Sequence, residues 1–533
     1  MINGEMQDYP LTLDRFLSHG AKWYPNAKIV TTLSEDHTIR SSFAEFHRRC
    51  RGLSHGISEL GVAQGEHVAT LAWNTQSHLE AWYSIMNIGA VCLTLNPRVS
   101  VEQLVVMVRQ ANARVLMVSA DQQALVHAML AHQLDLETVV VTDGAIDASC
   151  FADWPTLNVI EQSSLFGDVS DSPLWGNFPE TAPAGLCFTS GTTGAPKGVT
   201  YTHRSSYLHA QRLMHASTMA VAERETILVA TPLFHANAWG LPFAALGAGA
   251  SLILPGRDLH SEQLARTIAQ EAVTVCVGVP TVWLGLVDYV EKQHIELPSL
   301  ERIIMGGAPL PSAVLKRIES ALGVRVQTSW GMTELSPLGS ITAPYSNASH
   351  QGASGKPPLG VDLAVTDVDG KPLMQQREEE GHLVVRGSSV IQRYFGHKDP
   401  ADHARGWFIT GDLAKIDEGG QLYITGRAKD LIKSGGEWIN PAEIERIVGA
   451  FPEVSLAAVI GRVDAKWGER PILLLEMRRQ QSLSDDAILE ALAAQVPKWW
   501  IPDGIYRLDT MPLATTGKID KNKLRAEYSV PMD

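Results

Sequence analysis

Cysteine is scarce in this chain of 533 residues. The five cysteines are scattered, and none is paired with another at the spacing of a metal site; they are Cys50, Cys92, Cys150, Cys187 and Cys276. An odd, sparse set of thiols is typical of a reducing compartment, so we expect a cytoplasmic protein. An apolar stretch is also missing from the acidic residues 1–16, and we therefore expect no secretory signal.

Positive charge is in short supply as well. The chain has 44 lysines and arginines against 58 acidic residues, a net charge of -14, which argues against nucleic acid as a partner. Its 45% hydrophobic and 19% charged residues suit a globular protein with large cores. Only residues 236–255 form a long run almost free of charge, and this run contains Asn237, Pro242 and several glycines. We predict a buried helix followed by a strand over residues 251–254, and no membrane span.

Apolar, β-rich runs alternate with helical patterns through most of the chain. The first series predicts strands at 67–72, 90–95, 114–118 and 138–142, with helices at 77–88, 101–110 and 122–131 between them. The second predicts strands at 273–279, 302–305 and 324–328, with helices at 281–290 and 311–322. Such alternation indicates α/β architecture with parallel sheets covered by helices. Residues 145–183 lack clear periodicity, and we interpret them as a surface excursion.

The pattern changes after about residue 352. Short predicted strands at 362–367, 382–386 and 421–425, separated by turns, indicate a β-rich subdomain over about 352–426. A compact α/β tail follows, with a helix near 441–448 and strands near 456–463 and 472–478. We predict a large N-terminal domain over 1–428 and a small C-terminal domain over 429–533.

The most informative segment is a loop rich in glycine and hydroxyl groups between two predicted strands, 184–188 and 198–202. Glycines allow backbone N–H groups to approach a phosphate, hydroxyls add donors, and a lysine adds a mobile positive charge. The candidate phosphate-binding residues are Thr189, Ser190, Gly191, Thr192, Thr193, Gly194 and Lys197. A flexible linker would not be framed so tightly by strands. The loop is also not a Walker A motif, because Gly198 and a strand follow Lys197.

This loop resembles the signature of the AMP-forming adenylating enzymes, which include acyl-CoA synthetases, adenylation domains of peptide synthetases and beetle luciferases. The resemblance extends over about residues 30–525, with the other motifs in family order. It implies a large domain of two parallel-sheet subdomains and a β-barrel-like subdomain, capped by a mobile C-terminal domain. It also implies ATP and CoA as cosubstrates and Mg²⁺ as cofactor. A homodimer is common in the family.

Two further motifs follow predicted strands, where open α/β sheets bind their ligands. The run from Trp330 to Glu334 matches the family's aromatic-Gly-x-Thr-Glu motif, in which Thr333 contacts phosphate and Glu334 binds Mg²⁺ through oxygen. The segment 306–309 borders adenine and the acyl group in the family. The remaining residues that the resemblance assigns to ATP and AMP here are Gly307, Ala308, Pro309, Ser329, Trp330, Gly331 and Met332.

Thr410-Gly411-Asp412 matches the family's ribose-binding motif, where a carboxylate can accept from both hydroxyls. Arg427 lies fifteen residues after Asp412 and would be a second contact to ribose or phosphate. Lys429 occupies the family's hinge position. The following run would line the CoA thiol tunnel after domain rotation, through Lys433, Gly435 and Gly436.

Lys518 is the predicted catalytic lysine, because Pro512 to Lys518 resembles the family's terminal P-x-x-x-x-G-K motif. Leu513 replaces a lysine that is frequent after that proline. Lys521 and Lys523 are nearby, and the alternative interpretation makes all three a solvated basic tail. Gly517 and the apolar Ile519 favour Lys518 as the inserted side chain.

The acyl pocket is expected near His235, which would gate it close to the substrate carboxylate, and Trp239, which would shorten or flatten it. A shared helical face would bring these two together. Gly306 and Gly331 complete the predicted pocket. The run Asn237-Ala238-Trp239-Gly240 resembles medium-chain fatty acid and 3-(methylthio)propanoate CoA ligases, and the pocket segments lack a basic residue. We therefore expect a short or medium, uncharged, linear acid; an aryl acid such as cinnamate is the alternative.

Three other classes fit less well. A stand-alone adenylation enzyme would transfer the acyl group to a carrier protein, but no carrier domain is attached. A luciferase-like oxygenase finds no support in the residues. A non-catalytic binding protein is at odds with the intact Glu334 and Lys518. The sequence therefore predicts an acid–CoA ligase that works through an acyl-adenylate.

Overall fold

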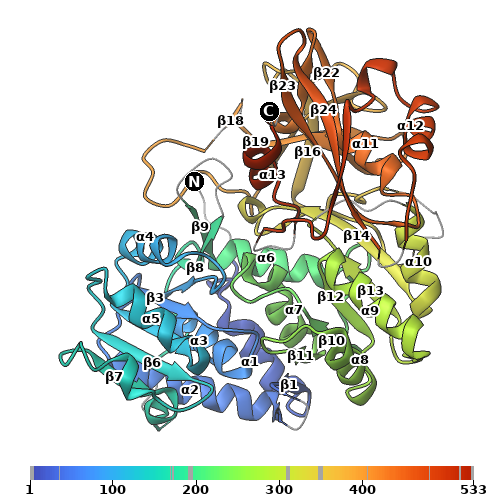
Figure 1. The fold of residues 1–533 in the computed structure, drawn as a ribbon. Coiled ribbons are helices and arrows are strands. Elements are labelled where there is room, and N and C mark those ends of the chain that lie inside the picture. The colour runs from blue at the N-terminus through green and yellow to red at the C-terminus, as the bar shows by residue number, and fades with distance from the viewer. Residues whose placement is uncertain are drawn as a thin grey trace.

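Three sheets and a C-terminal α+β unit build the protein, as Figure 1 shows in a computed structural model. The described residues are 5–34, 37–168, 170, 173–189, 196–307, 312–345, 352–401, 403–404, 406–478, 481–514 and 518–529. The mixed α/β architecture predicted from the alternating pattern is confirmed.

The first sheet has seven strands in the order β7-β6-β5-β3-β4-β8-β9, all parallel except the last pair. Its central strands are buried on both faces, which explains their continuous apolar sequence. The strands are β3 (His67–Leu71), β4 (Val91–Thr94), β5 (Val115–Ser119), β6 (Thr138–Thr142), β7 (Asn158–Glu161), β8 (Pro183–Thr189) and β9 (Lys197–Thr202). The accompanying helices are α2 (Phe43–Glu59), α3 (Gln76–Asn87), α4 (Val101–Ala111) and α5 (Gln123–Leu130).

The second sheet has eight strands in the order β15-β14-β13-β12-β10-β11-β1-β2, with antiparallel pairs only at its two edges. The strands are β1 (Lys28–Thr32), β2 (Thr38–Ser42), β10 (Thr226–Val229), β11 (Ser251–Leu254), β12 (Val275–Gly278), β13 (Arg302–Met305), β14 (Arg325–Gly331) and β15 (Leu338–Ile341). The helices are α1 (Asp14–Trp23), α6 (His203–Met214), α7 (Leu241–Ala248), α8 (Ser261–Gln270), α9 (Pro280–Gln293) and α10 (Ser312–Leu322). The sequence pattern did not reveal that β1 pairs with β11, more than two hundred residues away.

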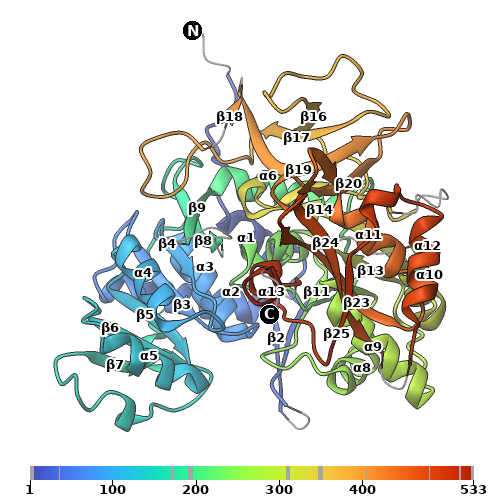
Figure 2. The ribbon, with the colours of Figure 1, turned by 45° about the horizontal axis from the view of Figure 1, so that its top comes forward.

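The third sheet is antiparallel and contains β16 (Val361–Thr366), β17 (Glu380–Gly387), β18 (His403–Ala404), β19 (Trp407–Ile416) and β20 (Leu422–Arg427). The C-terminal unit follows with β21 (Ile432–Ser434), β22 (Glu437–Ile439), β23 (Val454–Asp464), β24 (Gly468–Met477) and β25 (Gly504–Leu508), and with α11 (Pro441–Val448), α12 (Asp485–Ala493) and α13 (Lys521–Tyr528). Figure 2 shows this unit, in red, on the same side of the molecule as α9 and α10. An ion pair of 3.9 Å between Arg478 and Asp288 of α9 joins it to the second subdomain.

Two predictions about local structure had different outcomes. Residues 145–183 are not merely a surface excursion, because β7 within them pairs with β6 and extends the first sheet. Its half-exposed edge position explains why the apolar pattern is weak there. The charge-free run 236–255 does contain a buried helix, α7, followed by the strand β11, as predicted. In the part of the chain that the structure describes, no helix combines the length and apolarity that crossing a bilayer requires.

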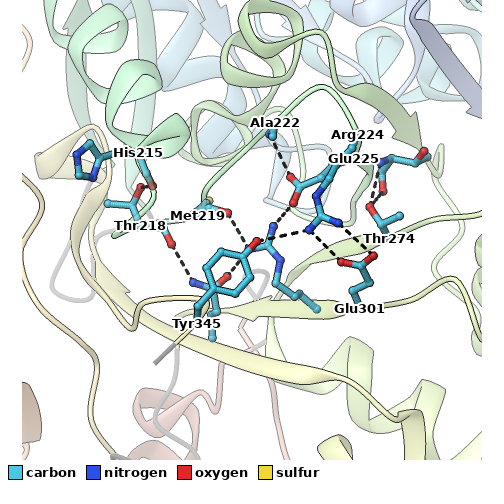
Figure 3. Close-up of polar contacts among 12 residues, drawn as sticks. His215, Thr218, Met219, Ala222, Arg224, Glu225, Thr274, Glu301 and Tyr345 are labelled. Atoms are coloured by element: carbon cyan, nitrogen blue, oxygen red, sulfur yellow. Dashed lines mark hydrogen bonds and ion pairs between the residues drawn. The ribbon is translucent and has the colours of Figure 1, made fainter. Parts of the chain in front are cut away.

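A buried ion pair fixes the second sheet at the end opposite the predicted ligand site. Arg302, at the start of β13, pairs with Glu225, and both side chains are almost fully buried. Arg302 also donates to Gln327 of β14 and to the Met219 carbonyl, each at 2.7 Å. Figure 3 shows Glu225, Met219 and Thr218 brought together in this cluster. The network therefore ties β10, β13 and β14 to the segment that follows α6.

We expect Glu225→Gln to lower the free energy of unfolding by about 3 kcal/mol or more, because it leaves the Arg302 charge buried without its counter-ion. Asp362→Asn is the matched control: its partner Arg386 lies 2.8 Å away, but both side chains are more than half exposed. That control should cost less than about 1 kcal/mol. Urea-unfolding midpoints of both variants would measure the difference, and equal losses would contradict the structural role of the buried pair.

Candidate functional site

The predicted phosphate loop connects two antiparallel strands. In the hairpin of β8 and β9, Thr189 pairs with Lys197, and the Thr189 hydroxyl donates to the Lys197 carbonyl at 3.4 Å. The side chain of Lys197 is exposed, and its Nζ lies 4.9 Å from the centre of the Tyr394 ring. The predicted residues inside the loop, Ser190, Gly191, Thr192, Thr193 and Gly194, lie outside the described part of the chain.

Two glycines at the end of β13 allow close approach of other groups. A Cβ on Gly306 would lie 2.6 Å from the Ser329 hydroxyl and 3.1 Å from the Trp239 ring. Gly307 has a φ of +95°, which L side chains rarely adopt, and a Cβ there would lie 3.6 Å from Cε of Lys518. The structure therefore brings Gly306 against Trp239 and Gly307 against Lys518. The neighbouring candidates Ala308 and Pro309 are outside the described residues.

At the end of β14, the motif that contains Trp330 is hydrogen-bonded to the predicted ribose motif that contains Asp412. The strand continues to Gly331, beyond the predicted end at residue 328, and Trp330 is buried. The Trp330 indole N–H donates to Oδ2 of Asp412 at 2.9 Å, while Nε of Arg427 lies 2.7 Å from Oδ1. Asp412 and Arg427 are cross-strand partners on β19 and β20. Close packing explains why a glycine is needed at position 331, since a Cβ there would lie 2.2 Å from the Pro337 carbonyl.

Thr333 and Glu334 form a short 3₁₀ turn directly after Met332, whose backbone N–H donates to Pro337. The Thr333 carbonyl accepts from the Tyr201 hydroxyl at 2.8 Å. The Glu334 side chain is largely buried, and its Oε1 accepts from the Tyr394 hydroxyl at 3.0 Å. No signal in our motif analysis pointed to Tyr394.

Lys518 reaches this group of residues from the C-terminal unit. The residue is exposed to solvent by its accessible surface, although many protein atoms lie around its ammonium. Burial lowers the pKa of Lys518, and the Arg427 guanidinium lowers it further, whereas Asp412 and Glu334 oppose the shift. The lysine therefore lies within electrostatic range of both motif carboxylates. By contrast, Lys521 pairs with Glu445 at 2.7 Å within the C-terminal unit, and Lys523 lies on α13.

His235 begins an unusual turn. Burial, and then the nearby Lys518 charge, lower its pKa to about 4, so the imidazole is neutral at neutral pH. The following residues, Ala236–Gly240, all have positive φ, so His235 and Trp239 do not share an α-helical face as predicted. Each non-glycine residue in this conformation costs about 1–2 kcal/mol. Surrounding contacts must hold the turn, and the bond of 2.8 Å between Nε2 of His209 and the Trp239 carbonyl is one of them.

Asn74 anchors the segment before this turn and was missed by sequence reasoning. Its side-chain amide donates to the carbonyls of Val229 and Thr231 at 3.0 and 2.9 Å, and it accepts from the Leu233 N–H at 2.7 Å. Asn74 follows β3 of the first sheet, whereas its partners are the last residue of β10 in the second sheet and residues just after it. A lone buried asparagine carries no recognisable motif, so only the folded chain reveals this link between the subdomains.

The residues assigned to domain movement and CoA follow Arg427 in the chain. Lys429 is in the 3₁₀ turn Ala428–Asp430, and burial is the main cause of its lowered pKa. Gly435 and Gly436 form the two-residue loop of the β21–β22 hairpin with φ of +60° and +94°, which explains both glycines conformationally. Nζ of Lys433 lies 5.4 Å from the centre of the Trp438 ring.

We expect the stability of the protein to fall as the pH drops from about 6.5 to about 4, partly because of His235. A histidine with a folded pKa near 4 takes up a proton on unfolding in this window, since its unfolded pKa is about 6.5. Buried His78, His203 and His209 act in the same direction. The decrease in Tm between pH 7.5 and pH 5 should therefore be smaller in His235→Asn than in the wild type. An identical decrease in both proteins would show that His235 is not held neutral.

Comparison with known proteins identifies the family of this chain. The family model "AMP-binding enzyme" matches residues 17–395, and "AMP-binding enzyme C-terminal domain" matches residues 443–518. The chain is 36% identical to the 3-methylmercaptopropionyl-CoA ligase of Ruegeria lacuscaerulensis, with 98% of each chain covered. It is also 36% identical to the medium-chain-fatty-acid–CoA ligase of Ectopseudomonas oleovorans, covering 98% of this chain and 97% of the relative.

Among solved structures, the anthranilate CoA ligase AuaEII in complex with anthranoyl-AMP shares the fold, with a TM-score of 0.86 and 23% identity over 98% of this chain and 99% of that one. Both family models and the full-length relatives lead to the same assignment. The chain belongs to the AMP-binding enzymes, within the AMP-forming acyl-CoA synthetases.

Proposed function

We propose that this AMP-forming acid–CoA ligase activates a short or medium, uncharged, linear carboxylic acid, including the thioether 3-(methylthio)propanoate. The observation that supports the adenylation step best is the position of Lys518. This lysine comes from the C-terminal unit, has its Cε 3.6 Å from where a Cβ on Gly307 would stand, and lies within electrostatic range of Asp412, Glu334 and His235.

In the first half-reaction, a carboxylate oxygen of the acid attacks the α-phosphorus of ATP. The bond from this phosphorus to the bridging oxygen of the β-phosphate breaks, and pyrophosphate leaves. Negative charge collects around the α-phosphorus, so positioned cations and donors supply the catalysis. Lys518 would reach the α-phosphate and the acid carboxylate, Thr333 and the 189–197 loop would bind phosphates, and Asp412 with Arg427 would bind ribose.

Mg²⁺ fits Glu334 by the chemistry of the donor. The Glu334 carboxylate is largely buried and has one oxygen, Oε1, hydrogen-bonded to Tyr394. Mg²⁺ prefers oxygen ligands and is usually bound by one or two carboxylates together with substrate phosphates. When bound, it would neutralise phosphate charge. The arrangement that we propose is therefore Glu334 together with the phosphates of ATP.

In the second half-reaction, the CoA sulfur attacks the acyl carbon, the bond to the AMP oxygen breaks, and the thiol proton passes to solvent. Lys518 would occupy the site before this step, while Lys433 lies over Trp438 and Gly435 donates to Trp467 within the C-terminal unit. Rotation about Lys429 would withdraw Lys518 and bring the hairpin to the adenylate.

The choice of acid follows from Trp239 and His235. The Trp239 ring lies close to Gly306, 3.1 Å from where a Cβ would stand, and we propose that the indole forms one side of the acyl pocket. The neutral His235 offers no charge to a second carboxylate. Relatives named as 3-methylmercaptopropionyl-CoA and medium-chain fatty acid ligases support the same class of acid.

We expect Lys518→Ala to reduce acid-dependent ATP–pyrophosphate exchange about a hundredfold or more, because it removes a cation from the transition state. The same variant should still convert a synthetic acyl-adenylate and CoA to acyl-CoA. Lys523→Ala is the matched control, since this lysine is close to Lys518 in the sequence but lies on α13, outside the predicted motif, and it should retain exchange. Normal exchange by Lys518→Ala, with an unchanged Tm, would rule out the assigned role.

Acyl-CoA and AMP formation across acetate to decanoate, 3-(methylthio)propanoate and cinnamate would test the proposed acid. We expect Trp239→Ala to raise kcat/KM for octanoate relative to butanoate by about tenfold, because it removes the indole that limits the pocket. Gly306→Ala should shift the preference towards shorter acids. Trp23→Ala, which removes a largely exposed tryptophan, is the control. A preference for cinnamate would support an aryl acid, and pyrophosphate release without acyl-CoA would support a carrier protein as acceptor.

A further inference from the structure

A short segment between β17 and β18 contacts two ATP motifs that are far apart in the sequence. The backbone N–H of Ile391 donates to the Glu334 carbonyl at 2.9 Å, and the N–H of Phe395 donates to the Gly198 carbonyl at 2.8 Å. The first bond reaches the Thr-Glu turn after β14. The second reaches β9, immediately after Lys197 at the exit of the phosphate loop. The 391–395 segment thus fixes both motifs through its backbone.

Tyr394 makes the same connection with its side chain. Its hydroxyl donates to Oε1 of Glu334 at 3.0 Å, and its ring faces Nζ of Lys197, 4.9 Å from the ring centre. Tyr394 therefore lies between an anion and a cation that both belong to the predicted ATP site. Neither contact follows from the sequence motifs, because Tyr394 is about 60 residues beyond one partner and almost 200 beyond the other.

The two contacts have different physical consequences. A hydrogen bond to a carboxylate is stronger than one between neutral groups, and it fixes the rotamer of Glu334 while leaving Oε2 available to a cation. The ring attracts the Lys197 ammonium through its quadrupole and has no negative charge that would neutralise it. A direct pair between Lys197 and Glu334 would consume both charges, whereas an intervening tyrosine keeps each available for the nucleotide.

We propose that Tyr394 is a positioning residue for MgATP: its hydroxyl presents Glu334 to the metal, and its ring holds Lys197 towards the phosphates. This inference rests on the proposed function of Glu334 and Lys197 in binding MgATP. Tyr394 acts through these two side chains and need not contact the reacting atoms.

Two substitutions separate the contacts. Tyr394→Phe keeps the ring beneath Lys197 but removes the hydroxyl from Glu334, and Tyr394→Leu removes both. Tyr423→Phe is a matched control, because the Tyr423 hydroxyl also donates to a carboxylate, Oδ2 of Asp417, at 3.2 Å, but at the turn between β19 and β20. All variants are made in the full-length chain, and Tm without ligand measures any general loss of stability.

The decisive measurement is the Mg²⁺ dependence of nucleotide binding and of ATP–pyrophosphate exchange. Calorimetric titration with a non-hydrolysable ATP analogue at a series of Mg²⁺ concentrations gives binding without turnover. Tyr394→Phe should raise the Mg²⁺ concentration for half-maximal binding and exchange about five- to tenfold, with little change in KM for the acid. Tyr394→Leu should in addition weaken binding of the analogue at saturating Mg²⁺, and Tyr423→Phe should change neither.

The outcomes distinguish the positioning role from the proposed function. An unchanged Mg²⁺ dependence in Tyr394→Phe, with an active wild type, overturns only the role of Tyr394. A lower Tm that is accompanied by equal losses for acid, ATP and Mg²⁺ also overturns it, because this is the result of a general structural defect. If the wild type itself shows no Mg²⁺-dependent binding of the analogue, the proposed function of Glu334 fails, and the inference about Tyr394 fails with it.

Discussion

The predicted site depends on one interaction: the Lys518 ammonium lies within electrostatic range of Asp412 and Glu334, which come from other parts of the chain. Surrounding protein atoms lower the pKa of Lys518 even though the residue remains exposed, and Asp412 and Glu334 provide the opposing negative charge. The two carboxylates belong to different sheets, and the lysine belongs to a third unit. The charged group therefore forms only when these parts of the chain come together.

The parallel sheets explain where this group lies. In open α/β sheets, ligands bind beyond the carboxyl ends of the strands, and here Gly306 with Gly307, and Thr333 with Glu334, follow neighbouring strands β13 and β14. The antiparallel third sheet adds Asp412 and Arg427 as direct cross-strand partners. Regular strand geometry thus sets the spacing of the motifs, while loops and short turns supply the functional side chains.

Packing around the site leaves little space for alternative side chains. A Cβ on Gly339 would lie 2.2 Å from the Trp330 ring, and one on Gly331 would reach the Pro337 carbonyl at the same distance. The left-handed turn over residues 236–240 is held by contacts from elements outside it, including His209 and, through the preceding segment, Asn74. Strained backbone of this kind persists only when its surroundings determine it. The acyl side of the site is consequently a product of long-range packing.

The sequence by itself determined the fold class, the family and the strands of the regular α/β series, because their apolar periodicity and glycine-rich motifs are local. It also predicted the domain boundary at residue 429 and the roles of the site residues, which stay predictions. It could not show β7, whose edge position weakens the pattern, or the pairing of β1 with β11. Only the tertiary structure decided that Trp330 donates to Asp412, that the turn after His235 is left-handed, and that Tyr394 lies between Lys197 and Glu334. These contacts join residues tens to hundreds of positions apart, and their energies depend on distances that no local pattern specifies.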